Sequence, residues 1–161
     1  MSKSQKDKDK GNTYKFKVVF IGDHNVGKTA ILDKCLDKDD LTNTPTLITN
    51  VEEETRLWSS TDMETHLMLY DTPGKESDES FKQNTMTHYK EADGVIICFD
   101  ITNKESFQHI DDKWLPKIRE HNQFCPIMIL GNKMDLEDDR KIDKNEAKVI
   151  IIFFTWDIPN I

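Results

Sequence analysis

Short apolar runs, separated by longer polar stretches, give this chain its pattern. The first run alternates with polar residues and then becomes wholly apolar over Lys15–Ile21, and it stops at Gly22. A buried strand that feeds a turn has this pattern. Further runs follow at His66–Tyr70, Gly94–Phe99, Pro126–Leu130 and Val149–Phe154. Because polar stretches of helical length lie between most of them, we expect an α/β fold with a mostly parallel sheet and crossover helices.

Two of the intervening segments have the pattern of helices. Residues Lys28–Leu36 follow the glycine-containing turn, and Phe107–Arg119 repeats apolar residues at helical spacing. Pro116 is expected to kink the second helix, because proline removes a backbone donor. A further strand-like segment, Val51–Trp58, is followed by the polar residues 59–62 and then by another apolar run. This arrangement predicts a hairpin.

The N-terminal segment differs in composition from the rest. Residues Met1–Thr13 are almost entirely polar, so burial cannot offset the entropy of ordering them, and we expect a disordered tail. A basic docking segment is the alternative, but Asp7 and Asp9 interrupt its lysines. Residues 14–161 have the length of one domain, and the sequence shows no internal repeat.

Charge and cysteine content limit the classes of function. The formal net charge of -8 disfavours general affinity for nucleic acid, so any phosphate site must be local. Cys35, Cys98 and Cys125 lack the spacing of paired metal ligands, and we expect buried thiols in a reducing compartment rather than a zinc site or a disulfide. No apolar run approaches the roughly 20 residues of a membrane span, and no signal peptide is visible, which favours a cytoplasmic protein.

A glycine motif of eight residues follows the first predicted strand. It reads Gly22-Asp23-His24-Asn25-Val26-Gly27-Lys28-Thr29 and fits the pattern Gly, four residues, Gly-Lys-Thr. Glycines let the backbone wrap closely, so that amide N–H groups and the helix N-terminus point at phosphates, while Lys28 supplies a mobile cation. Because the motif lies between a predicted strand and a predicted helix, it indicates a phosphate site rather than an ordinary glycine turn.

Two groups in the sequence suit magnesium. The Thr29 hydroxyl directly follows the loop lysine, and Asp71 begins the segment Asp71-Thr72-Pro73-Gly74 at the end of an apolar strand. Mg²⁺ takes oxygen ligands and shares them between protein, phosphate and water. The pattern Asp-x-Pro-Gly alone also suits an ordinary turn, so Asp71 indicates a metal site only in combination with the phosphate loop.

A third motif indicates the base. Asn132-Lys133-Met134-Asp135 follows the apolar run that ends at Leu130, at the strand edge where open parallel sheets bind ligands. The Asp135 carboxylate can accept hydrogen bonds from the N1 and exocyclic amine of guanine. Adenine lacks that donor pair and would leave the carboxylate unpaired. Alone, the motif could be a polar loop after a strand.

These motifs, in this order, resemble those of the Ras superfamily of small GTPases, and the resemblance runs from about Tyr14 to Asp135. Segments His88–Val95 and Asp100–Phe107 are most similar to the Rab branch. The resemblance implies a P-loop G-domain with a mostly parallel six-stranded sheet and helices on both faces, which binds GTP or GDP with Mg²⁺. The implied nucleotide contacts are Gly22, Asp23, His24, Asn25, Val26, Gly27, Lys28, Thr29, Ala30, Thr46, Asp71, Gly74, Asn132, Lys133 and Asp135.

The resemblance also implies two loops that respond to the γ-phosphate. Thr46 best matches the family threonine that binds Mg²⁺ and the γ-phosphate, with Thr44 and Thr49 as alternatives. Gly74 would sense the same phosphate from the second loop. The implied metal ligands are Thr29, Thr46 and Asp71. Effectors, exchange factors and activating proteins would bind through Asp39–Val51 and Asp71–Lys90.

The second loop departs from the family pattern. Lys75 stands where the family usually has the glutamine that orients the attacking water, and a protonated lysine cannot accept a hydrogen bond from that water. Pro73 is expected to stiffen the same loop. We therefore expect slow hydrolysis, with Lys28, Thr46, Gly74 and Lys75 as the residues placed at the reacting phosphate.

Other departures concern the loop, the base and the C-terminus. His24 and Asn25 replace residues that are small in the family, and no aromatic lies at Asp39–Leu41 to cover the guanine. Binding should survive, with weaker affinity. After Val149–Phe154 the chain reads only Thr155–Ile161, so we expect a G-domain over residues 14–161 that lacks its final helix. Neither a Gly at position 2 nor a Cys near residue 161 is present, so no lipid anchor is expected.

The sequence as a whole predicts a small GTPase-type molecular switch with slow GTP hydrolysis and a Rab-like role in vesicle trafficking or signalling. The alternative is a hydrolysis-deficient pseudo-GTPase that acts as a nucleotide-bound interaction module. A P-loop kinase is disfavoured, because the motif after Leu130 suits guanine and no lid-like arginine cluster is present.

Overall fold

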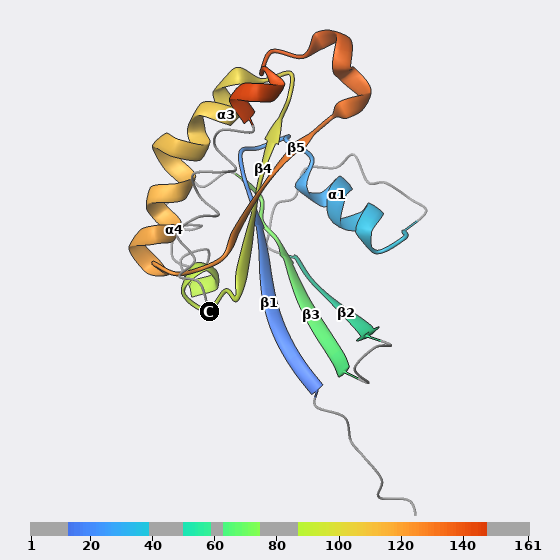
Figure 1. Cartoon of the computed structure of the whole chain (residues 1–161). Helices are drawn as coiled ribbons and strands as arrows, with labels where there is room; N and C mark the ends of the chain where they lie inside the picture. The colour runs from blue at the N-terminus through green and yellow to red at the C-terminus, as the bar shows by residue number, and fades with distance from the viewer. Residues whose placement is uncertain (1–12, 39–49, 59–62, 75–86, 148–161) are drawn as a thin grey trace, which may run out of the picture.

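The computed structural model of the chain describes residues 13–38, 50–58, 63–74 and 87–147 (Figure 1). Five strands in these ranges form one sheet in the order β2-β3-β1-β4-β5. The strands are β1 (Thr13–Ile21), β2 (Asn50–Trp58), β3 (Met63–Asp71), β4 (Gly94–Asp100) and β5 (Ile127–Asn132).

The pairing of the strands confirms a mostly parallel sheet. Strand β1 runs parallel to both β3 and β4, and β4 runs parallel to β5. Strands β2 and β3 pair antiparallel, with Trp58 opposite Met63, which confirms the predicted hairpin. The sixth expected strand, at Val149–Phe154, lies outside the described residues.

Helices cover both faces of the sheet (Figure 1). Helix α1 (Lys28–Cys35) lies on one face, where Phe20 and Cys98 pack with its Leu32. On the other face lies a helical segment made of α3 (Lys104–His109), the π-helical turn η1 (Ile110–Trp114) and α4 (Leu115–His121). Val19 and Ile21 pack against that segment. Because both faces are covered, the end of β1 is apolar at every position, as its sequence predicts.

The helical segment begins three residues earlier than its apolar spacing predicts, because Asn103 caps it. The Asn103 side-chain oxygen accepts hydrogen bonds from the backbone N–H of Glu105 at 3.0 Å and of Ser106 at 3.4 Å. Pro116 lies in the first turn of α4, and because the helix runs on directly from η1, its missing N–H removes one backbone donor to the preceding turn. Thus the irregularity expected at Pro116 takes the form of a π turn just before it.

Two expectations from the sequence are wrong. Thr13, expected in the tail, is the first residue of β1, because it pairs with Glu64 in the parallel ladder; residues 1–12 of the expected tail lie outside the described residues. Cys35, expected to be buried, is exposed, because it is the last residue of α1 and lies beyond the core. Cys98 and Cys125 are buried, as expected, and the structure has all three as thiols.

Within the part of the chain that the structure describes, no helix combines the length and apolar character needed to cross a membrane.

Candidate functional site

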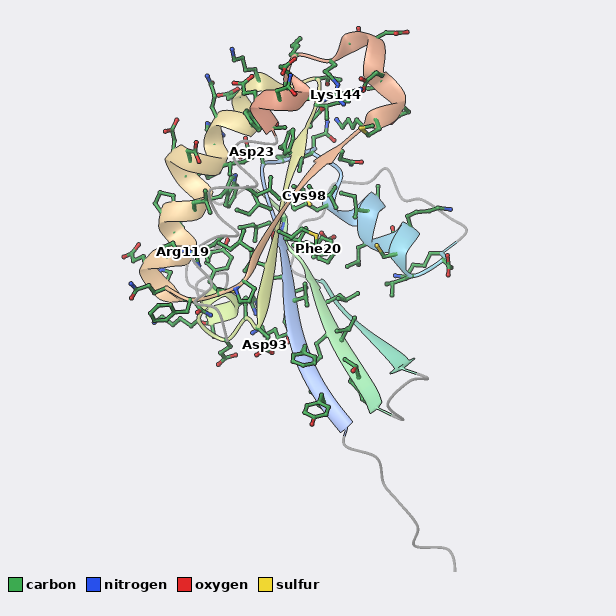
Figure 2. All side chains as sticks on the ribbon, viewed as in Figure 1. Phe20, Asp23, Asp93, Cys98, Arg119 and Lys144 are labelled. Atoms are coloured by element: carbon green, nitrogen blue, oxygen red, sulfur yellow. The ribbon has the colours of Figure 1, made fainter. Side chains whose placement is uncertain are left out.

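The carboxyl ends of four strands meet at one edge of the sheet. The parallel register places Phe20 opposite Asp71, Ile21 opposite Ile97, and Asp100 opposite Asn132. Figure 2 shows Asp23 at this edge and Asp93 toward the opposite end of the sheet. The motif residues that follow β1, β3 and β5 are therefore brought together where open α/β sheets bind ligands.

The glycine loop turns the chain from β1 into α1 through left-handed backbone conformations. The φ angles are 135° at Gly22, 67° at Asn25 and 88° at Gly27, the residue that precedes α1. A Cβ on Gly22 would collide with the backbone oxygen of Cys98, and one on Gly27 would collide with the Asn132 side chain. The two glycines are thus required both by conformation and by close packing against β4 and Asn132.

Lys28 folds back over the loop that precedes it. Its side chain is buried, with 5% of the residue exposed, and its Nζ donates to the carbonyl oxygens of Gly22 at 3.0 Å and Asp23 at 2.8 Å. The loop backbone therefore fixes the ammonium group in a site of low exposure. There a positive charge acts more strongly on an anion than it would in water.

Thr29 and Asp71 lie side by side at the start of α1 and the end of β3. The Thr29 hydroxyl donates to the Asp71 carboxylate over 2.6 Å, and Asp71 is 1% exposed. A hydroxyl and a carboxylate are the hard oxygen donors that Mg²⁺ prefers, so these two residues fit the metal that the sequence implies. When bound, Mg²⁺ would neutralise charge on the phosphates. Among the described residues, no group of three or more His, Cys, Asp or Glu side chains could hold a metal ion.

The turn after Asp71 lies against the phosphate loop. The Thr72 hydroxyl donates to the backbone oxygen of Phe20 at 2.8 Å, which ties the turn to β1. Gly74 has a φ of 71°, and a Cβ there would lie 2.6 Å from Lys28 Nζ and 2.8 Å from the backbone oxygen of Asp23. Gly74 is therefore close to the loop. Thr46 and Lys75, the other residues predicted for the two loops, lie outside the described residues.

The guanine motif contacts the phosphate loop through its asparagine. Asn132 donates from its side chain to the carbonyl oxygens of Val26 at 2.9 Å and Gly27 at 3.4 Å. Lys133 has a left-handed backbone, with a φ of 64°, and Asp135 is exposed in the 3-10 helix η2 (Met134–Asp139). The asparagine thus holds the phosphate loop, while the aspartate is open to a ligand.

Asp100 pairs with the lysine of the same motif, a contact that the motif did not predict. Lys133 Nζ lies 2.7 Å from Asp100 Oδ2, and Thr102 donates to Oδ1 from its N–H at 2.8 Å and from its hydroxyl at 2.7 Å. Burial raises the pKa of Asp100, but the hydrogen bonds from Lys133 and Thr102 outweigh it, and the pKa is lowered. Asp100 is therefore an ionised partner that fixes Lys133 beside the loop.

Asp23 has a second set of partners that motif reasoning missed. Its carboxylate lies 2.6 Å from His109 Nδ1, 3.1 Å from Trp114 Nε1 and 3.5 Å from Lys113 Nζ. In the sequence, these partners are visible only as polar residues beside a core tryptophan on a helix that follows β4. Neither spacing nor composition placed that helix next to the loop.

Known proteins are similar to this chain over most of its length. The Ras family profile matches residues 17–152. Similar proteins include two from Arabidopsis thaliana, Ras-related protein RABA5b, 33% identical over 90% of this chain and 65% of its own length, and Ras-related protein RABA4b, 35% identical over 84% of this chain and 58% of its own length. Ras-related protein Rab11D from Nicotiana tabacum is 35% identical over 84% of this chain and 59% of its own length.

These relatives all have Rab names, and the chain spans less than two thirds of the length of each of the three. The matched region includes the phosphate loop, the Asp71 turn and the Asn132 motif, which the structure brings to one edge of the sheet. From its profile match and its assembled motifs, the chain belongs to the Ras family of small GTPases.

Proposed function

We propose that this chain binds GDP and GTP with Mg²⁺ and works as a molecular switch. The observation that carries the proposal is the convergence of Lys28, the Thr29–Asp71 pair and Asn132 on a single loop. Lys28 and the loop amides would hold the phosphates. Thr29 and Asp71, together with Thr46, would hold the metal.

Base selection is assigned to the exposed Asp135. Its carboxylate would accept from the two donors of guanine, and Lys133, fixed by Asp100 at 2.7 Å, would lie beside the nucleotide. Because Asn132 bonds to the carbonyl oxygens of the phosphate loop, base recognition and phosphate recognition share one framework. Guanine should therefore be preferred over adenine.

We further propose that GTP hydrolysis by this chain is slow. In hydrolysis, a water oxygen attacks the γ-phosphorus while the bond to the leaving GDP breaks, and the family glutamine orients that water. Lys75 occupies the position of the glutamine in the sequence. The protonated side chain can donate but cannot accept a hydrogen bond from the water.

A second candidate is a nucleotide-bound interaction module without hydrolysis, favoured by Lys75 and by the buried Pro73 before Gly74. In either case, effectors and regulators would bind at Asp39–Val51 and Asp71–Lys90. By resemblance to the Rab branch, we propose a role in vesicle trafficking or signalling.

Single-turnover hydrolysis of bound GTP separates the two candidates. We expect wild-type protein to release phosphate slowly but faster than protein-free buffer, and Lys75→Gln to raise the rate about tenfold or more. Lys90→Gln, which removes an exposed lysine within Asp71–Lys90, is the control and should leave the rate unchanged. A wild-type rate equal to buffer, with no gain in Lys75→Gln, would support the interaction module instead.

A further inference from the structure

Asp23 is the residue of the phosphate loop whose side chain reaches the opposite helical layer. Its carboxylate, 17% exposed, accepts from Trp114 Nε1 at 3.1 Å and bonds His109 Nδ1 at 2.6 Å, with Lys113 Nζ at 3.5 Å. All three partners belong to the segment formed by α3 and η1. The loop is therefore tied to this helix as well as to the sheet.

The π turn explains how one carboxylate can meet both rings. His109 and Trp114 are five residues apart, and in an α-helix at 3.6 residues per turn they would point roughly 140° apart. In η1 the Leu115 N–H donates to the Ile110 oxygen, which is the spacing of a π-helix. This wider turn brings residues five apart onto the same face of the helix, as residues four apart are in an α-helix. The irregular helix thus creates a site for the Asp23 carboxylate.

The backbone of Asp23 faces the site. Its carbonyl oxygen accepts from Lys28 Nζ at 2.8 Å, and it lies close enough to Gly74 that an added Cβ there would come within 2.8 Å. Any shift of Asp23 would therefore move both the loop lysine and the turn after Asp71. The Lys113 ammonium also offsets the negative charge that Asp23 would place near bound phosphates.

We infer that Asp23 is a positioning residue for the nucleotide: held by His109, Trp114 and Lys113, it fixes the phosphate loop to α3 and η1, so that this helix controls how fast nucleotide leaves. The inference rests on the proposed function, since it requires that the loop hold a nucleotide. It assigns to the helix a role that the motifs themselves do not contain.

The test is the dissociation rate of a fluorescent GDP analogue in the presence of Mg²⁺. His109→Leu removes the donor to Asp23, and we expect GDP to leave about tenfold faster, the effect of one charge-assisted hydrogen bond. His109→Asn retains a side-chain N–H near the position of Nδ1 and should stay within about twofold of wild type. Glu105→Gln, a change on the other side of the ring, at 4.0 Å from His109 Nε2, is the control and should have no effect.

Urea unfolding of each variant accompanies the kinetics, because a merely structural role would give Asn and Leu variants that differ in stability but not in GDP release. If wild type binds GDP but His109→Leu releases it at the wild-type rate, or if His109→Asn is as fast as His109→Leu, the positioning role is overturned while nucleotide binding stands. If folded wild type binds no GDP, the proposed function fails, and the positioning role fails with it.

Discussion

At the scale of single residues, three carboxylates at the edge of the sheet hold three different parts of the site. Asp71 accepts from Thr29 at 2.6 Å, and these two residues would help to hold the metal. Asp23 binds the helical layer, and Asp100 binds Lys133. Asp23 and Asp100 are each set among several hydrogen-bond donors, which is how a protein keeps charge in a partly buried site. The exposed Asp135 is left for a ligand.

Replacing Asp135 tests base recognition directly. In Asp135→Asn, the amide N–H₂ would face the donors of guanine, and we expect GDP affinity to fall by at least about 100-fold. Xanthine has a carbonyl in place of the exocyclic amine, so a xanthosine diphosphate should bind the variant better than GDP does. Competition against a fluorescent analogue measures both. The control is Asp138→Asn, an exposed aspartate of the same 3-10 helix; equal losses in the two variants would contradict the base contact.

Asp100 should make stability depend on pH. The pKa of Asp100 is lower in the folded protein than in the unfolded chain, so the unfolded chain binds the Asp100 proton more tightly. The stabilisation that the charged Asp100 provides is therefore fully present above pH about 5 and is lost as pH falls through about 4 and below. We expect Asp100→Asn to lower the free energy of unfolding by about 1–2 kcal/mol at pH 7 and by less at pH 3.5. Urea unfolding at the two pH values measures the difference.

Asp111 provides a control of opposite sign. Partial burial, and then the neighbouring Asp112, raise the pKa of this exposed carboxyl, so its charge weakly destabilises the folded state above pH about 4. Asp111→Asn should therefore stabilise the protein at pH 7, and the gain should shrink on acidification. A wild-type advantage over Asp100→Asn that does not change between the two pH values would contradict the ion pair with Lys133.

The side chains that the sequence predicted best are those fixed by motif spacing. Lys28, Thr29 and Asn132 all lie in or against the phosphate loop, because each stands at or just after the end of a strand at the same edge. The Asp100–Lys133 pair and the bond from Thr72 to β1 were not predicted. Such contacts depend on the register between strands, which the pattern of one strand does not specify.

At the scale of elements, the turn from β1 into α1 is the most constrained feature. Gly22 combines a φ of 135° with a backbone contact to β4 that leaves no room for a Cβ. By contrast, Gly94 at the start of β4 has room for a Cβ, whose nearest neighbour, the Pro126 backbone oxygen, would lie at an ordinary contact distance of 4.0 Å. Alanine at these two positions therefore compares a site that excludes a Cβ with one that accepts it.

Gly22→Ala is expected to lower the free energy of unfolding by about 3 kcal/mol or more, because the variant must adopt a strained backbone and displace β4. Gly94→Ala should change it by less than about 1 kcal/mol. Thermal or urea unfolding of both variants measures this. Similar losses in the two would mean that the loop is not packed against Cys98 as described.

The helical segment shows why element boundaries were harder to predict than element types. Apolar spacing correctly indicated a helix around Phe107–Arg119, but its start is set by the Asn103 cap and its middle by a π turn. Caps and π turns arise from local hydrogen bonds, so a hydrophobic period does not reveal them. The π turn matters here, because it aligns the two rings that hold Asp23.

At the scale of the whole molecule, a sheet covered on both faces brings distant parts of the chain to one edge. The α/β class, the mostly parallel sheet and the hairpin follow from the sequence and are confirmed. The order of the strands was not predicted, because an apolar run indicates a buried strand but does not identify the strands that pair with it. Thr46, Lys75 and the strand expected at Val149–Phe154 lie outside the described residues and stay predictions.

The central claim is that this edge of the sheet binds guanine nucleotide with magnesium. The most direct measurement is titration of the purified chain with a fluorescent GDP analogue, with Mg²⁺ or with EDTA, followed by competition with GDP and ATP. We predict saturable binding of one nucleotide per chain that weakens in EDTA, with GDP at least about 100-fold more effective than ATP as a competitor. Folded protein that fails to bind the analogue, or that releases it equally to ATP and GDP, would contradict the account.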